Sequence, residues 1–177
     1  MTTTDQTPIA APDPLGAALA TVVAEGDAHS VRRIGEACLA ALPTTRVAIT
    51  VRTGDGRRES VWACDEAARD LDGLQFRLGE GPCLDAFAGP DPVHVPDLAE
   101  VPPHRWPVFA GAALRSGVRA VHAFPLHVGA LTVGILALYR DEPGELAPED
   151  LAGARRAADA VLWTLLARRG DGPAVGR

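Results

Sequence analysis

Apolar residues recur at helical spacing in two stretches near the start of the chain and in one stretch near its end. The first two predict helices that begin near Leu15 and near Val31, and Pro43 ends the second. The last predicts a long helix from Pro148 to Arg169, because proline and two acidic residues occupy its first turn. Two helices therefore precede the rest of the domain, and one long helix follows it.

Apolar and polar residues alternate in the middle of the chain, which predicts two β-hairpins separated by shorter elements. The expected strands are residues 47–51, 59–64, 118–128 and 131–140. The last of these is almost continuously apolar, so we expect it in the centre of a sheet. Short helices are predicted at 65–71 and 108–116.

A segment rich in glycine and proline runs from Gly79 to Pro107. A connection of this length is either functional or contains small elements of its own, and a short helix near Cys83 and a strand at Val93–Val95 are the candidates. The expected fold class is α+β, with an antiparallel sheet between a layer of terminal helices and a layer of loops and short helices. We expect one domain at 15–169, with flexible tails at 1–14 and 170–177.

The composition and net charge of the chain exclude some classes of function. The chain has 177 residues, 47% of them hydrophobic, with 17 basic against 23 acidic residues and a net charge of −6. This balance disfavours direct binding to nucleic acid, and the absence of a long apolar run or a leader segment predicts a cytoplasmic protein without a membrane partner. Three cysteines, Cys38, Cys64 and Cys83, without C-x-x-C spacing favour neither a disulfide framework nor a zinc site.

Several motifs along the chain together resemble the GAF domains of actinobacterial GAF–ANTAR proteins. They are Leu78–Ala86, Val93–Leu98, Arg105–Phe109, Ala123–Leu126 and Gly134–Arg140. The resemblance covers about residues 15–169, and it implies a small-molecule sensor in signal transduction or transcription regulation. In that family a C-terminal ANTAR module binds RNA. No such module is recognisable in this sequence, so the resemblance implies no RNA binding here.

The sequence offers candidates for a ligand site between the sheet and the segment 79–116. They are Phe76, Leu78, Cys83, Trp106, Phe109, His122 and Phe124. Each also has a purely structural interpretation: the aromatic side chains and Cys83 as packing, and the Gly79–Pro82 turn as a turn rather than an anion cradle. By alternation His122 shares a face with Phe124, which is either the helix-covered core or the wall of the ligand cavity.

The terminal helices carry apolar stripes that predict a homodimer. The candidate interface residues are Leu15, Leu19, Val22, Leu151, Ala154, Ala158, Val161 and Leu165. The last helix is apolar over more than one side, so it must be buried on more than one side. The competing interpretation is that the stripe only covers the sheet of its own chain.

No catalytic or metal-binding constellation is recognisable, and the sequence leaves any cofactor undetermined. We therefore expect a non-catalytic GAF-type sensor that binds an unidentified small molecule. One alternative is a dimerisation or docking module without a ligand. The other is a cysteine-dependent enzyme similar to methionine sulfoxide reductase, although the cysteine motif of those enzymes is not recognisable here.

Overall fold

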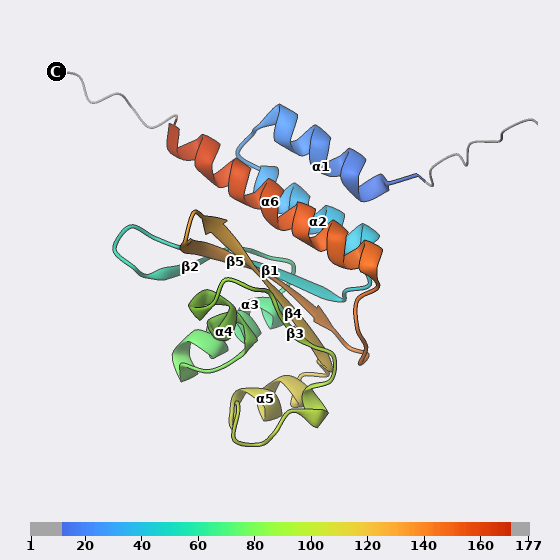
Figure 1. The fold of residues 1–177 in the computed structure, drawn as a ribbon, viewed down its shortest axis with the longest axis vertical. Coiled ribbons are helices and arrows are strands. Elements are labelled where there is room, and N and C mark those ends of the chain that lie inside the picture. Colours follow the sequence, from blue (N-terminus) through green and yellow to red (C-terminus); the bar gives the residue numbers. More distant parts are fainter. Residues whose placement is uncertain (1–11, 171–177) are drawn as a thin grey trace, which may run out of the picture.

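The computed structural model describes residues 12–170 and contains a five-stranded sheet with helices on both faces (Figure 1). The strands are β1 (Arg46–Arg52), β2 (Arg58–Ala63), β3 (Val93–Val95), β4 (Ala120–Val128) and β5 (Leu131–Arg140). Their order is β2-β1-β5-β4-β3, and every neighbouring pair is antiparallel. The apolar strand β5 is central, as predicted.

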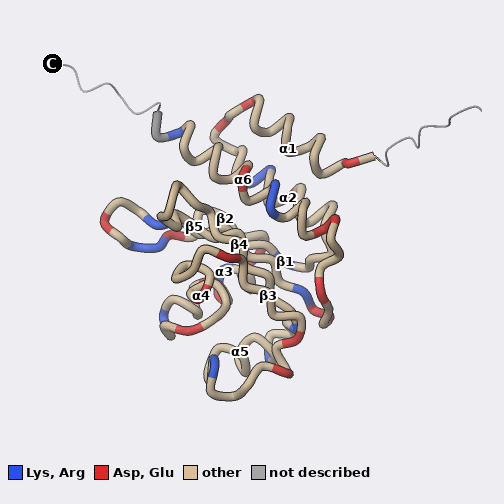
Figure 2. Tube along the Cα trace, in the orientation of Figure 1, with Lys and Arg blue, Asp and Glu red and all other residues tan. Residues whose placement is uncertain are grey.

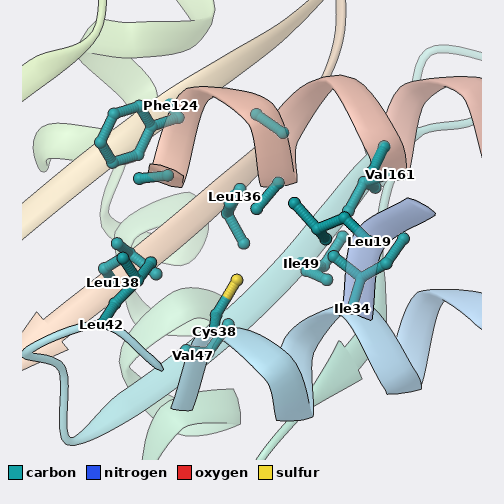
Figure 3. Close-up of a cluster of buried hydrophobic side chains, with 14 of the residues drawn as sticks. Leu19, Ile34, Cys38, Leu42, Val47, Ile49, Phe124, Leu136, Leu138 and Val161 are labelled. Atoms are coloured by element: carbon teal, nitrogen blue, oxygen red, sulfur yellow. The ribbon is translucent and has the colours of Figure 1, made fainter. Parts of the chain in front are cut away.

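Three helices from the two ends of the chain cover one face of the sheet. They are α1 (Pro14–Glu25), α2 (Ser30–Ala41) and α6 (Pro148–Gly170). In the cluster beneath them, Cys38 of α2 and Val161 of α6 pack with Leu136 of β5 (Figure 3). The helix α1 lies outside α2 and α6, and Asp13 both caps its first turn and forms an ion pair with Arg156 of α6.

Helices from the middle of the chain cover the opposite face. They are α3 (Glu66–Leu78), α4 (Pro82–Ala88), the 3-10 helix η1 (Leu98–Glu100) and α5 (Phe109–Arg115). A second hydrophobic cluster lies between them and the sheet, and it contains Leu71, Cys83, Phe109 and Tyr139. The sheet is therefore the middle layer of three, and the predicted α+β class is confirmed.

The helix α3 is the main difference from the expected elements, because it continues to Leu78 instead of ending near Leu71. Its second half buries two polar residues, Asp72 and Gln75, on the face that meets the sheet. Those residues interrupt the apolar periodicity by which a helix is identified in a sequence. The segment 79–107 contains α4, β3 and η1, as a long connection in a compact domain predicts.

The apolar stripes of the terminal helices are buried within a single chain. Six of the eight proposed interface residues, Leu15, Leu19, Val22, Ala154, Ala158 and Val161, are at most 5% exposed, while Leu151 and Leu165 are partly buried against the same cluster. The stripe of α6 meets both the sheet and α1, which explains why it is wide. This packing corrects the assignment of these residues to a dimer interface.

The positions of the acidic and basic residues are interspersed along the described chain (Figure 2). Among the described residues, no helix combines the length and the apolar character needed to cross a membrane. The predicted tails fall mainly on residues 1–11 and 171–177, which lie outside the described residues. The terminal helices include one residue of each predicted tail, because α1 begins at Pro14 and α6 ends at Gly170.

Candidate functional site

A polar cluster is buried in the second hydrophobic cluster, where α3 and α4 cross the sheet. Asp72 and Gln75 come from α3, Thr50 from β1, Cys83 from α4 and Tyr139 from β5. The Gln75 side chain is central: its Nε2 lies 3.1 Å from the Tyr139 hydroxyl and 3.2 Å from the Cys83 Sγ, and its Oε1 accepts a 2.8 Å bond from the Cys83 backbone N–H. One amide side chain thus joins three elements.

Asp72 is the least satisfied member of this cluster. Its side chain is 2% exposed, and the Thr50 hydroxyl donates to its Oδ2. Its Oδ1 is buried without a hydrogen-bond partner among residues 12–170. Burial raises the pKa of Asp72 from 3.8 to about 6, because the charged form is poorly solvated, and the bond from Thr50 offsets only part of this effect.

The Gly79–Pro82 motif forms the corner that places Cys83 beside Gln75. Gly79 ends α3 with a left-handed φ of 71°, and Pro82 begins α4. Gly81 has a φ of 132°, and a Cβ there would lie 2.5 Å from the Gln75 Oε1. The Glu80 side chain accepts 2.7 Å bonds from the backbone N–H groups of Val108 and Phe109 at the start of α5. The motif is therefore a structural turn that connects α3, α4 and α5.

The cysteines are poorly suited to thiolate chemistry. Burial, together with the charge of Asp72, raises the pKa of Cys83 far above that of a free thiol. Burial raises the pKa of Cys38 to about 12, and it raises that of Cys64 as well. Cys38 and Cys83 belong to the clusters on opposite faces of the sheet. These two thiols are therefore held apart by the sheet.

The structure brings together only part of the ligand site expected from the sequence. Cys83, Trp106 and Phe109 are in contact with the same cluster and are at most 2% exposed. Phe76 lies at its border, where it packs edge-on against Phe87 with ring centroids 5.9 Å apart. Leu78, at the end of α3, is 37% exposed.

His122 and Phe124 are on the other face of the sheet, which corrects their assignment to a single site with Cys83. Phe124 belongs to the cluster beneath α2 and α6 (Figure 3). His122 is fully buried, and its Nδ1 lies 3.1 Å from the Nδ1 of His94 on β3. Burial, then the neighbouring His94 and Arg140, lowers the pKa of His122 to about 4. The backbone of Gly144 lies beside the ring and opposes this lowering, although His122 Nε2 has no hydrogen bond of normal geometry within the described residues.

The core around Cys83, Trp106 and Phe109 is closely packed, and none of the five surface hollows of about 300–600 Å³ in the described residues is lined by these three side chains. The segment 79–116 meets the sheet at one of these hollows, of about 410 Å³, which lies between Phe87–Pro90 and the ends of β1, β4 and β5. Within residues 12–170, no group of three His, Cys, Asp or Glu side chains has the geometry to hold a metal ion. A ligand in the polar cluster would therefore require α4 to move.

Sequence reasoning did not identify Thr50, Asp72, Gln75 or Tyr139. Asp72 and Gln75 are three residues apart and so share a helix face, which was the available signal. Their partners are distant in sequence, and polar residues on a short helix are ordinarily assigned to solvent.

Comparisons with known proteins agree on the fold. The GAF domain of a phosphoenolpyruvate-protein phosphotransferase from Acinetobacter superposes with a TM-score of 0.67 at 9% identity, over 92% of this chain and 99% of that chain. A domain of a putative two-component sensor histidine kinase from Sinorhizobium meliloti gives 0.65 at 20%, over 81% and 94%. The free methionine-R-sulfoxide reductase of Neisseria meningitidis, solved with its substrate, gives 0.63 at 18%, over 92% and 96%.

These identities are low enough that the three structures show the fold alone. The search of curated proteins gave no match. The model of the GAF domain family, however, matches residues 28–161, which is most of the chain and includes the whole sheet and the helices on its second face. The chain therefore belongs to the GAF domain family.

Proposed function

We propose that the protein is a non-catalytic regulatory sensor domain whose ligand binds at the polar cluster around Asp72. The observation that carries this proposal is the buried Asp72 carboxylate, whose Oδ1 has no partner in the described chain. Buried carboxylates are ordinarily paired, because an unpaired one destabilises the fold. The sequence resemblance to the GAF modules of actinobacterial GAF–ANTAR proteins supports the same regulatory role.

The chemistry of the cluster favours a ligand with a cationic N–H donor. Such a group would pair with Asp72 Oδ1 and stabilise the charged form of the carboxylate. Because the cluster is closed by α4, entry of the ligand would shift α4 against β4 and β5, which it contacts. This displacement is the signal that a regulatory domain needs.

The test is a thermal-shift screen of the free chain with small probes that carry an ammonium group, namely alkylamines, the free amino acids and L-methionine-R-sulfoxide. At least one probe is expected to stabilise the native chain and to lose its effect in Asp72→Asn. The exposed Asp70, also on α3, supplies the control variant Asp70→Asn, which should respond like the native chain. A screen in which no probe distinguishes Asp72→Asn from Asp70→Asn would contradict the proposal.

The close packing around Cys83, Trp106 and Phe109 favours a second candidate, a docking module without a ligand. In such a module the three side chains only stabilise the fold. The same screen separates the two candidates, because a docking module would show no saturable response to any of these probes.

We predict that the chain does not reduce methionine sulfoxide. That reaction yields a thioether and water while two thiols are oxidised to a disulfide, and it begins with attack by a thiolate. Burial raises the pKa of all three thiols, and the sheet separates Cys38 from Cys64 and Cys83. The assay measures turnover of free L-methionine-R-sulfoxide with dithiothreitol or thioredoxin as reductant. Ellman's reagent should label at most the half-buried Cys64 in the folded chain and all three thiols after unfolding. Turnover that disappears in Cys83→Ser would overturn this prediction.

We also propose that the protein is a homodimer, with an interface on the outer side of α1 and α6. Val23 and Trp163 are 44% and 64% exposed there, and both line a shallow hollow between the two helices. Apolar surface of this kind is typical of protein interfaces. The expected mass by light scattering is that of a dimer.

Trp163→Glu should shift the light-scattering mass to that of a monomer, because it places a charge on the proposed interface. The exposed Val61 of β2 supplies a matched control, and Val61→Glu should leave the dimer intact. A native monomer, or a dimer that tolerates Trp163→Glu, would contradict this interface.

We further propose that the protein acts in the cytoplasm and does not bind nucleic acid directly. Its net charge of −6 opposes binding to phosphates, and its three cysteines are free, as is usual in reducing compartments.

A further inference from the structure

A mainly apolar hollow lies on the face opposite the polar cluster, where the end of α6 crosses the ends of three strands. Seven of its eight lining residues are aliphatic, and they come from α6, β1, β4 and β5. Leu162 and Leu165 form the helix side, and Val51 and Val133 contribute to the sheet side. The hollow has a volume of about 370 Å³. This volume is at the lower end of the range of small-molecule sites.

The only charged residue in the lining is Arg168, near the end of α6. Its side chain is exposed, and it forms no ion pair among the described residues. Arg52 lines the adjacent hollow, which shares Leu131 with this one. Within the described chain, no acidic residue lines either hollow. The charge around this apolar hollow is therefore positive, and an anion is the complementary occupant.

We propose that this hollow binds an amphipathic monocarboxylate, a medium-length unbranched acyl chain whose carboxylate pairs with Arg168. The aliphatic walls exclude water from the chain, and the guanidinium provides two parallel N–H donors that match the geometry of a carboxylate. The site is separate from the Asp72 cluster and does not depend on the function proposed there.

A ligand in this hollow would affect the rest of the molecule through its contact with α6. An acyl chain between α6 and the sheet would contact Leu165, which packs against the same core as Val161. Filling the hollow would therefore bias the position of the end of α6. That end leads directly to the residues that follow Gly170.

The experiment is calorimetric titration of the full chain with hexanoate, octanoate, decanoate and dodecanoate. Affinity should rise about fourfold for each added methylene until the hollow is full, and then level off. Arg168→Ala should weaken decanoate about tenfold and leave 1-decanol unchanged. The matched control Arg115→Ala, at an exposed arginine of α5, should bind both as the native chain does.

A second variant tests the walls of the hollow. Val133→Phe adds bulk inside the hollow and should weaken decanoate and 1-decanol together, with the fold checked by circular dichroism. The proposal is overturned if no alkanoate binds saturably, or if Arg168→Ala leaves decanoate binding unchanged.

Three other occupants would each give a distinct result that also overturns the proposal. If the hollow is a membrane contact, the chain will bind phosphatidylglycerol vesicles and no soluble alkanoate. If residues 171–177 fill it, a chain ending at Gly170 will bind decanoate more than tenfold tighter than the full chain. If a second copy fills it, the chain will form a dimer that Leu131→Glu abolishes. Decanoate will not affect that dimer.

Discussion

Replacing Asp72 by asparagine is expected to stabilise the protein at pH 7 by about 1–2 kcal/mol. The rise of the Asp72 pKa from 3.8 to about 6 means that its ionisation at neutral pH destabilises the fold by about 3 kcal/mol. Asparagine keeps an acceptor for the Thr50 hydroxyl but leaves a buried N–H unpaired, which offsets about 1–2 kcal/mol of the gain. Urea unfolding at pH 7 measures the difference.

The pH dependence of this variant gives a sharper result than its stability at one pH. Folded Asp72 keeps its proton up to about pH 6, whereas the unfolded chain releases it near pH 3.8, so the folded state binds more protons between these values. This group therefore removes stability as the pH rises from about 4 to 6. The stability of Asp72→Asn relative to the native chain should therefore rise over this range, and that of Asp70→Asn should stay constant. A native chain and Asp72→Asn with parallel profiles would contradict the burial of this carboxylate.

A substitution that stabilises a protein at the expense of a function identifies a residue retained for that function. Asp72 is a candidate of this kind, because a leucine or an asparagine at this position would give a more stable domain. The stability measurement and the ligand screen test different statements. Stabilisation by Asp72→Asn without any ligand effect would support the burial of Asp72 and contradict the sensor proposal.

The sheet and the terminal helices were predictable because their residues follow one period over many positions. The strand β5 is apolar at nearly every position, and such a run is stable only when both faces of a sheet are covered. The polar cluster was not predictable in this way. Gln75 joins Cys83 and Tyr139, which are 8 and 64 residues distant, and local periodicity contains no information about pairs so far apart.

Strand alternation correctly grouped His122 with Phe124 but did not determine which layer covers them. That depends on where α6 returns to the sheet, which is a property of the whole chain. The same limit explains the apolar stripe of α6. Its width predicted burial on two sides, and the second side is α1 of the same chain rather than a second copy.

His122→Leu is expected to make the protein more resistant to acid. The unfolded chain takes up a proton on this histidine below about pH 6.5, whereas folded His122 stays neutral down to about pH 4. The unfolded state therefore binds more protons in this range, and acidification from pH 6.5 to 4 destabilises the native chain by up to about 3 kcal/mol through this group. Leucine removes the proton site, so the difference in unfolding free energy between the variant and the native chain should grow as the pH falls.

The exposed His104 provides the control, because His104→Gln removes a histidine without changing the core and should follow the native profile.

His94, the neighbour of His122, also has a lowered pKa. Burial lowers it most, Glu145 opposes this effect, and Arg155 adds to it. The contributions of Asp72 and His122 to stability oppose each other between pH 4 and 6. Relative to the native chain, Asp72→Asn should therefore lose more stability on acidification, and His122→Leu should lose less. A native chain as acid-resistant as His122→Leu would show that this histidine is protonated in the folded state.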